Sequence, residues 1–214
     1  MDVTIIGTGN MARAIGTRAL AGGHSVTILG KEAEKAESLA EELRPHAAQG
    51  ATVETGTSDQ PLEGDIVVLA VYYPDAMTFV EENPDELSGK TVVDVTNPID
   101  FETFDGLVTP PGSSAAEELQ QAAPGARFVK AFNTTFAGTL VAGQVAGNQL
   151  DVFIAGDDEE AKAKLAELLE SCGVRAIDAG PLRRARELEA LGFLHISLQE
   201  KLGTGFQSAA KIVA

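Results

Sequence analysis

The sequence is poor in cysteine, in large aromatic residues and in positive charge. Cys172 is the only cysteine, tryptophan is absent, and tyrosine occurs twice. A single thiol excludes an intramolecular disulfide, and no cysteine and histidine residues stand at metal-ligand spacing, so we expect no metal site. Because Cys172 follows a helical pattern and precedes a glycine, we expect a packed core thiol rather than a nucleophile.

Positive charge is scarce relative to negative charge. Lysine and arginine number 16 against 32 aspartate and glutamate residues, which gives a formal net charge of −16. Such a surface repels nucleic acids and anionic lipids, so we expect neither as a partner. Because nucleotide cofactors are anions too, this chain must place cations or helix amino termini wherever such a cofactor binds.

Long hydrophobic runs are also missing. No apolar stretch approaches the ~20 residues that span a bilayer, and the amino terminus enters a strand pattern without the charged and apolar regions of a signal peptide. We therefore expect a cytoplasmic protein with no membrane association. With 214 residues, of which 44% are hydrophobic, the chain is long enough for a sizeable core and one domain or slightly more.

What is present is a regular alternation of apolar runs and helical patterns. This alternation predicts an α/β fold with a doubly wound, mainly parallel sheet and helices on both faces. The run at 65–71 is apolar throughout, as expected for a strand that is covered on both sides. We expect strands at 2–6, 25–29, 51–54, 65–71, 91–95, 127–131, 151–155 and 174–178, and helices at 10–22, 32–44, 114–123, 158–171 and from 182 onward.

Two long stretches lack a clear pattern. Residues 97–112 are rich in proline and glycine, and a loop of this length in a compact domain is more often functional than idle. A second loop is expected to run from the strand at 127–131 through Gly147. In the carboxy-terminal helical stretch, Gly203 and Gly205 are expected to bend the helix.

The motif Gly7-x-Gly9-x-x-Ala12 follows the first strand and opens the first helix. It fits the dinucleotide-binding fingerprint with alanine in the third position. The first glycine permits the tight turn, the second lets a diphosphate approach the backbone, and the helix amino terminus offers N–H groups to the anion. The strand–turn–helix setting favours this reading over that of a bare turn.

The residues after the second strand indicate which dinucleotide binds. A site for NAD usually carries an acidic residue at this point, but here the strand ends at Leu29-Gly30-Lys31. Lys31, Lys35 and the hydroxyl of Thr8 are suited to a 2′-phosphate, so we favour NADP over NAD. The alternative is that both lysines belong to a solvated helix face, since Glu32 and Glu34 alternate with them.

Four elements together resemble the coenzyme F420-dependent NADP oxidoreductase family: the stretches 7–10, Gly30-Lys31 with Lys35, 130–134 and 178–182. Their order and spacing match along nearly the whole chain. The resemblance implies a Rossmann-like NADP-binding domain at 1–180, a small helical cap at 181–214 and a homodimer. It also implies hydride transfer between NADP(H) and the deazaflavin coenzyme F420 as second substrate.

The resemblance also implies which residues surround the two ligands. The turn at 8–11 would hold the pyrophosphate, Gly30 and the two lysines would face the 2′-phosphate, and residues 71–73 would line the nucleotide cleft. Residues 97–98 and 133–134 would lie where the two rings meet. The cofactor-binding set is Gly7, Thr8, Gly9, Asn10, Met11, Gly30, Lys31, Lys35, Val71, Tyr72, Tyr73, Asn97, Pro98, Asn133 and Thr134.

The chain departs from the family pattern at four places. Gly30 and Lys31 stand where relatives often have serine and arginine, and lysine in place of arginine removes a bidentate fork and weakens selection for NADP. Asn133 and Phe136 stand where some relatives carry histidine and proline. These two lie on the side of the second substrate, so the hydride partner is less firmly predicted than the NADP site.

Hydride transfer between two stacked rings requires proximity and exclusion of water but no nucleophile or proton shuttle, so we assign no catalytic side chain. Asn97 and Asn133 are candidates for amide hydrogen bonds to a ring carbonyl, and equally for loop caps. Arg183, Arg184 and Arg186 start a helix, where they would face an anionic tail of the deazaflavin or pair with Glu187, Glu189 or a second subunit.

Two other functions fit the same residues. One is an NADPH-dependent reductase whose acceptor is a flavin, a metal complex or a small carbonyl compound. The other is a non-catalytic protein that binds NADP as a sensor. The sequence alone does not separate them from the deazaflavin reaction.

Overall fold

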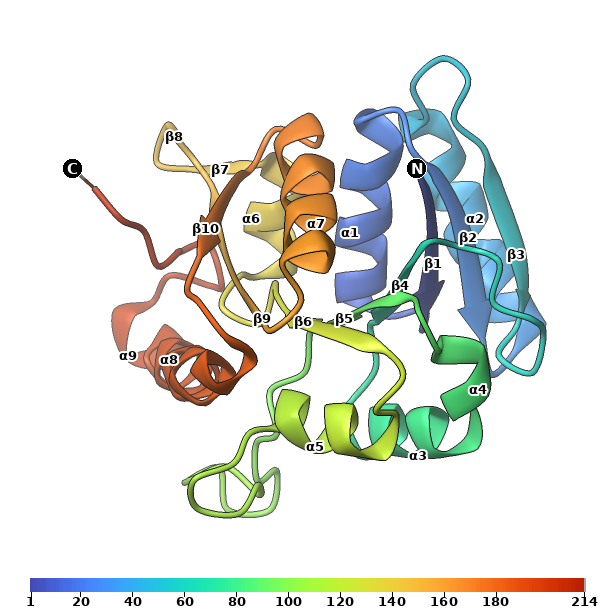
Figure 1. Ribbon diagram of the computed structural model, residues 1–214. Coiled ribbons are helices and arrows are strands. Elements are labelled where there is room, and N and C mark those ends of the chain that lie inside the picture. Colours follow the sequence, from blue (N-terminus) through green and yellow to red (C-terminus); the bar gives the residue numbers. More distant parts are fainter. Residues whose placement is uncertain (214) are drawn as a thin grey trace.

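The centre of the fold is an eight-stranded β-sheet with strand order β3-β2-β1-β4-β5-β6-β9-β10 (Figure 1). The structure is a computed structural model that describes residues 1–213. The strands of this sheet are β1 (Asp2–Ile6), β2 (Ser25–Gly30), β3 (Val53–Thr57), β4 (Ile66–Leu69), β5 (Thr91–Asp94), β6 (Arg127–Lys130), β9 (Asp151–Gly156) and β10 (Arg175–Asp178).

Strands β1 to β6 are parallel, and β9 pairs with β6 in the antiparallel sense. From β1 the chain builds β2 and β3 on one side, then returns to place β4, β5 and β6 on the other. This is the strand order of dinucleotide-binding domains, in which ligands bind at the carboxyl ends of the strands where the order reverses. The expectation of a mainly parallel, Rossmann-like sheet is confirmed.

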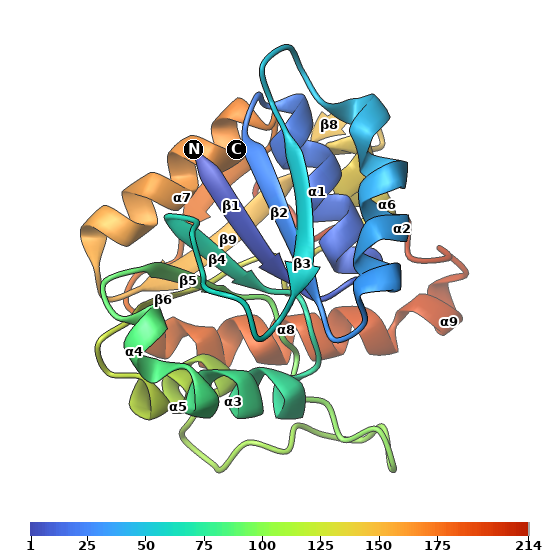
Figure 2. The same cartoon turned by 90° about the vertical axis from the view of Figure 1, so that its right-hand side faces the viewer.

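Helices cover both faces of the sheet, and each face has its own hydrophobic core (Figures 1 and 2). The strands between these cores are buried on both sides, which is why β4 consists of four consecutive apolar residues. One layer contains α1 (Asn10–Ala21), α2 (Ala33–Leu43), α6 (Ala137–Ala142) and α7 (Glu159–Ser171); the other contains α3 (Tyr73–Glu82), α4 (Pro84–Leu87), α5 (Ala115–Ala122) and α8 (Ala185–Ser197).

Local capping interactions define several helix ends. The Ser114 side chain accepts a hydrogen bond from the Glu117 N–H at the start of α5, and Asp158 does the same for Ala161 at the start of α7. Such caps satisfy N–H groups that have no partner within the helix. Helix α6 ends at Gly143 in the left-handed conformation, which glycine adopts without steric cost.

The third strand, expected at 51–54, covers Val53–Thr57 instead, and the described structure differs from the expectations at four further places. The strand expected at 65–71 is shorter, because the chain leaves the sheet after Leu69. Helices α3 and α4 were not predicted. The expected loop through Gly147 contains α6 and the hairpin of β7 (Gln144–Val145) and β8 (Asn148–Gln149).

The fourth difference lies near the carboxyl terminus. Helix α8 is followed by α9 (Gln199–Leu202), which ends where Gly203 takes a positive φ of 61°. The expected continuation beyond Gly203 is therefore wrong: Gly203 ends the helix instead of bending it, and residues 205–213 are irregular. The 3₁₀ helix η2 (Leu182–Arg184) precedes α8, and Leu182 and Ala185 join the core beneath α3 and α5. The start of the expected cap thus packs directly on the sheet.

Candidate cofactor-binding site

A cavity of about 740 Å³ lies at the carboxyl ends of the central parallel strands. The glycine turn after β1 forms its floor, and residues that follow β2, β4 and β5 form its walls. This is the position at which the strand order reverses, where a ligand is expected in a doubly wound sheet. Ten of the fifteen predicted cofactor residues line it: Gly7, Thr8, Gly9, Asn10, Met11, Lys31, Lys35, Val71, Tyr72 and Asn97.

The two glycines of the turn have different physical reasons to be glycine. Gly7 has a φ of +119°, and a Cβ built there would lie 2.3 Å from the carbonyl oxygen of Ala70. Gly9 precedes the first turn of α1, and a Cβ there would meet no atom within 4 Å. Gly7 is therefore required by the packing of β1 against β4, whereas the surface at Gly9 is open.

The start of α1 presents unfilled hydrogen-bonding capacity to this open surface. Gly9 is the N-cap of α1, and no side chain caps the helix among the described residues. Uncapped N–H groups together with the helix dipole favour an anion such as a diphosphate. The residues present at the turn therefore fit the diphosphate of a dinucleotide.

The cationic end of the cavity is built by the residues after β2. Lys31 and Lys35 both line the cavity, but each is ion-paired with a carboxylate: Lys31 with Asp75 at 2.6 Å and Lys35 with Glu32 at 2.5 Å. Gly30 lies outside the lining, and a Cβ at this residue would be 3.0 Å from the Thr8 side chain. Its role is therefore to leave room for Thr8.

The side chains of the residues that follow β4 point in different directions. Val71 and Tyr72 line the cavity, whereas Tyr73 does not. The Tyr73 hydroxyl donates a hydrogen bond to the Glu118 carboxylate on α5, and burial together with this carboxylate raises the pKa of Tyr73. The expectation that Tyr73 lines the nucleotide cleft is not supported, because the side chain at the first position of α3 faces α5.

The long loop at 97–112 contributes aromatic side chains to the cavity wall. Phe101 and Phe104 line the cavity, and the Tyr72 ring lies edge-on to Phe101 with centroids 5.4 Å apart. The row continues from Phe104 to Phe193 of α8. Sequence reasoning identified this loop as functional but did not identify these side chains.

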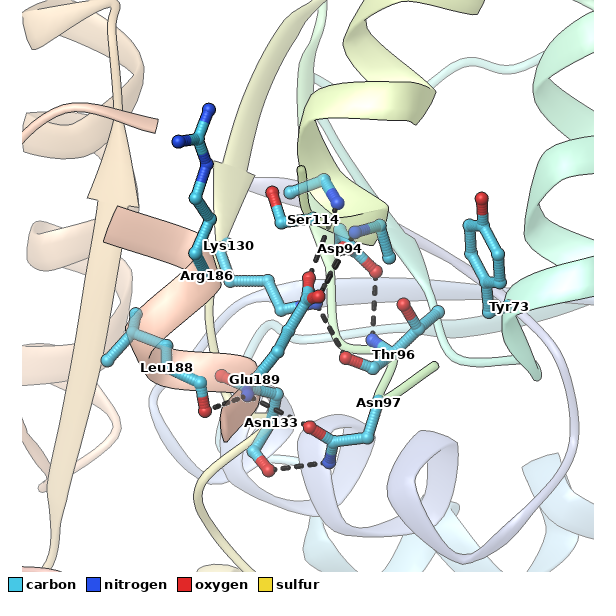
Figure 3. A network of polar contacts seen from close by, with 12 residues as sticks. Tyr73, Asp94, Thr96, Asn97, Ser114, Lys130, Asn133, Arg186, Leu188 and Glu189 are labelled. Atoms are coloured by element: carbon cyan, nitrogen blue, oxygen red, sulfur yellow. Dashed lines mark hydrogen bonds and ion pairs between the residues drawn. The ribbon is translucent and has the colours of Figure 1, made fainter. Parts of the chain in front are cut away.

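Two asparagines join the loops that follow β5 and β6. The Asn97 amide donates to the backbone oxygen of Asn133 at 2.8 Å, while the Asn133 amide donates to Asn97 Oδ1 at 3.0 Å and to the Leu188 carbonyl at 2.8 Å (Figure 3). These are the bonds of the loop-capping alternative, and a hydrogen bond to a ring carbonyl stays a prediction. Asn133 Oδ1 and Thr134 Oγ1 are buried without a hydrogen-bond partner among the described residues.

A second cavity of about 490 Å³ adjoins the first. Asn133 and Phe136 line it, whereas Pro98 and Thr134 line neither cavity. Phe136 packs against His195 and Phe206 with ring centroids 4.5 and 5.1 Å apart. Five residues line both cavities: Asn10, Met11, Val95, Asn97 and Ile196. The last comes from α8, so the carboxy-terminal helix closes the space between the two cavities.

A buried ionic cluster that the sequence did not predict lies beside the two asparagines. Lys130 Nζ contacts Asp94 at 2.8 Å, Glu189 at 2.7 Å and the Thr96 carbonyl at 2.6 Å, and the side chains of all three charged residues are at most 1% exposed (Figure 3). Burial would lower the pKa of Lys130, but the two carboxylates outweigh it and raise the pKa. Glu189 also accepts from the N–H of Ala115.

The cluster joins three elements at the base of the site. Asp94 and Lys130 end the neighbouring strands β5 and β6 in register, and Glu189 reaches them from α8. Burial, with the nearby Asp94 charge, raises the pKa of Glu189. A charged residue that ends each of two adjacent apolar runs was the available signal for this pair, and nothing in the spacing indicated Glu189.

Two of the three arginines before and within α8 form ion pairs with carboxylates of this chain. Arg186 forms a two-point contact with Glu117 at 2.6 and 2.8 Å, and Arg184 pairs with Glu187 at 3.0 Å. No ion pair of Arg183 occurs within residues 1–213. The expected partner Glu189 is instead bound to Lys130, as described above.

Three further features concern the lone cysteine, groups of metal-ligating side chains and the helices. Cys172 is buried, and burial raises its pKa to about 11, which keeps it a thiol. Among residues 1–213, no group of three or more metal-ligating side chains is close enough to hold an ion. Within the same residues, no helix combines the length and apolarity needed to cross a membrane.

Comparison with known proteins agrees with this geometry. Residues 2–98 match the family described as NADP oxidoreductase, coenzyme F420-dependent. The F420-dependent NADP reductase of Methanocaldococcus jannaschii is 31% identical over 97% of both chains. Rat metalloreductase STEAP3 is 33% identical over 88% of this chain, which spans 36% of that protein.

Solved structures agree as well. A candidate F420-dependent NADP reductase from Arthrobacter sp. FB24 superposes with a TM-score of 0.84, at 30% identity and 99% coverage of both chains. With a relative above 30% identity that is matched along almost its full length, the chain belongs to the family of coenzyme F420-dependent NADP oxidoreductases.

Proposed function

We propose that this protein is an oxidoreductase that transfers a hydride between NADP(H) and the deazaflavin coenzyme F420. The observation that carries the proposal is the pair of adjoining cavities that share five wall residues. The larger cavity contains the glycine turn and both lysines, which suits a dinucleotide. The smaller cavity shares Val95, Asn97 and Ile196 with the larger one, and a second planar ring would meet the first ring there.

The two ligands supply the redox chemistry when bound: one ring gives up a hydride and the other accepts it. The chain itself binds and orients them. The uncapped start of α1 would hold the diphosphate, and Lys31 and Lys35 would hold the 2′-phosphate. Met11, Val95 and Ile196 form apolar walls where the cavities meet, and such walls exclude water from the reacting rings.

The remaining polar groups at this junction position the walls. Asn97 and Asn133 are hydrogen-bonded to each other, and Asn133 is also bonded to Leu188 in the first turn of α8. The Lys130 cluster anchors the neighbouring strands β5 and β6. Direct hydride transfer needs this alignment and no proton shuttle at the reacting carbons.

A homodimer in the cytoplasm completes the proposal. Large apolar side chains remain exposed on α8, α9 and the following segment, among them Leu194, Leu202 and Phe206. Exposed apolar surface of this kind often marks a protein–protein interface. The lone cysteine is buried and unpaired, so the fold does not depend on an oxidising compartment.

A spectroscopic assay tests the proposed reaction. Purified protein is mixed with oxidised F420 and either NADPH or NADH. The absorbance of the deazaflavin at about 420 nm is followed, since only the oxidised ring absorbs there. We expect the absorbance to fall with NADPH. Parallel reactions contain FAD or a ferric chelate instead of F420. Absence of F420 reduction with either nucleotide would overturn the proposal, and turnover of FAD or iron alone would favour the reductase alternatives.

A further inference from the structure

An ion pair crosses the cofactor cavity between two different elements. Lys31 follows β2, and Asp75 lies in the first turn of α3, which follows β4. Strands β2 and β4 flank β1 in the sheet, and both connections lie at the lower end of the sheet in Figure 2. The 2.6 Å contact between Lys31 Nζ and Asp75 Oδ1 therefore links the two sides of the cavity that rises from the glycine turn.

This contact changes the charge available to a phosphate. The second lysine, Lys35, is paired with Glu32, so two cations at this end are matched by two carboxylates that also line the cavity. Glu32 lies three residues from Lys35 at the start of the same helix, whereas Asp75 approaches Lys31 from the opposite wall. A phosphate monoester carries a charge of about −1.5 to −2 near neutral pH, and it competes with Asp75 for the ammonium group of Lys31.

We propose that Asp75 is a specificity-determining residue that competes with the 2′-phosphate of NADP(H) for Lys31 and thereby lowers the preference of this chain for NADP(H) over NAD(H). The inference rests on the nucleotide half of the proposed function. The Lys31 and Asp75 side chains are 75% and 43% exposed, and an exposed ion pair is weak enough to yield to a more highly charged anion. After the exchange, the carboxylate of Asp75 stays beside the phosphate and repels it.

The test also decides against the opposite role, in which a carboxylate holds a lysine in the orientation that a phosphate needs. The two roles predict opposite changes in the affinity for NADP⁺ when Asp75 is replaced. If Asp75 competes, its removal strengthens NADP⁺ binding; if Asp75 positions Lys31, its removal weakens NADP⁺ binding. NAD⁺ has a hydroxyl at the same ribose position, so its binding is almost unaffected by competition for the lysine.

The test measures nucleotide binding instead of turnover. NADP⁺ and NAD⁺ are titrated by isothermal calorimetry at about pH 8 and low salt, where the phosphate is fully ionised. We expect Asp75→Asn to tighten NADP⁺ by about tenfold and to change NAD⁺ by less than about twofold. Asp85→Asn is the matched control, because Asp85 is an exposed carboxylate of α4 that does not line the cavity.

A double substitution then shows whether the effect passes through Lys31. In a Lys31→Ala background, Asp75→Asn should tighten NADP⁺ by less than about threefold, since only direct repulsion remains. Unchanged or weaker NADP⁺ binding by Asp75→Asn, an equal gain for NAD⁺, or an equal effect of Asp85→Asn would each overturn the inference. If the wild-type protein binds neither nucleotide, the proposed function is overturned as well. If it binds NADP⁺ without reducing F420, only the assignment of F420 as the hydride partner is overturned.

Discussion

At the scale of single residues, the two glycines of the first turn separate folding from binding. We predict that Gly7→Ala lowers the free energy of unfolding by about 3 kcal/mol, because an L-residue is strained at positive φ and the new methyl group meets the Ala70 carbonyl. Gly9→Ala should cost less than about 0.5 kcal/mol, since φ is −84° and the space is open. Urea unfolding followed by circular dichroism measures both; equal losses would contradict this assignment.

Where a motif fixed the backbone, the predicted residues do line one cavity, while their contacts to a cofactor stay a prediction. The turn at 7–11 and the lysines after β2 line the cavity as expected from strand–turn–helix order. The sequence predicted less well in which direction an individual side chain points. Tyr72 and Tyr73 are adjacent, yet only Tyr72 faces the cavity, because the first turn of α3 rotates the next side chain toward α5. Asp75 was missed because helix α3, which carries it to the cavity, was itself not predicted.

At the scale of elements, the buried ionic cluster should be the most sensitive tie between the sheet and α8. We predict that Lys130→Met lowers the free energy of unfolding by about 3–5 kcal/mol, because Asp94 and Glu189 then remain buried without a counter-charge. The measurement is again urea unfolding at pH 7.

Lys162→Met provides the comparison for this prediction. The Lys162 side chain is only 6% exposed, but its carboxylate partners Glu159 and Asp178 are largely exposed and regain water when the lysine is lost. The expected loss is below about 1.5 kcal/mol. A loss as large as that of Lys130→Met would show that lysine packing, instead of uncompensated buried charge, dominates both sites.

Asp151 ties the carboxy-terminal segment to the edge of the sheet. Its fully buried carboxylate accepts hydrogen bonds from Arg175, Lys211 and the Ile212 N–H. Burial alone would raise its pKa, but these hydrogen bonds outweigh burial and lower the pKa from 3.8 to about 2. Because the folded-state pKa is depressed, the stabilisation is fully present above pH 3.8 and is lost as the pH falls through about 2.

We therefore predict that Asp151→Asn lowers the free energy of unfolding by about 2 kcal/mol at pH 7. The difference between the wild-type protein and the variant should shrink as the pH falls from about 4 toward 2. Urea unfolding at a series of pH values measures this difference. A gap that stays constant across this range would mean that the amide removes packing instead of ionic hydrogen bonds.

The sequence predicted the type and order of most long elements, because buried parallel strands and amphipathic helices leave clear patterns. It failed for short elements. Helix α6 has six residues and the β7–β8 hairpin has four, too few for periodicity to distinguish them from a loop. Helix α3 begins with Tyr73-Pro74, and proline is compatible with a first helical turn, but no element was predicted between the strands at 65–71 and 91–95.

At the scale of the whole molecule, the charge imbalance should affect stability more than any single surface ion pair. The 32 acidic residues against 16 basic ones leave a net charge of −16, and self-repulsion of this kind destabilises the compact state. Salt screens it, since the Debye length falls from about 10 Å at 0.1 M to about 3 Å at 1 M. We predict that raising potassium chloride from 0.05 to 1 M increases Tm by about 3–6 °C.

A charge-reduced variant shows whether screening is the cause. Glu41, Glu81, Glu82 and Glu170 are exposed, lie in the last turns of α2, α3 and α7 and make no ion pair within residues 1–213. Changing all four to glutamine removes repulsion and breaks neither an ion pair nor a favourable helix-dipole interaction. This variant should melt higher than the wild type at 0.05 M salt and gain less from added salt, because less repulsion remains to be screened. Differential scanning calorimetry measures both quantities. An identical salt dependence in the two proteins would mean that salt acts through hydration of the folded surface, and that the acidic excess serves solubility without limiting stability.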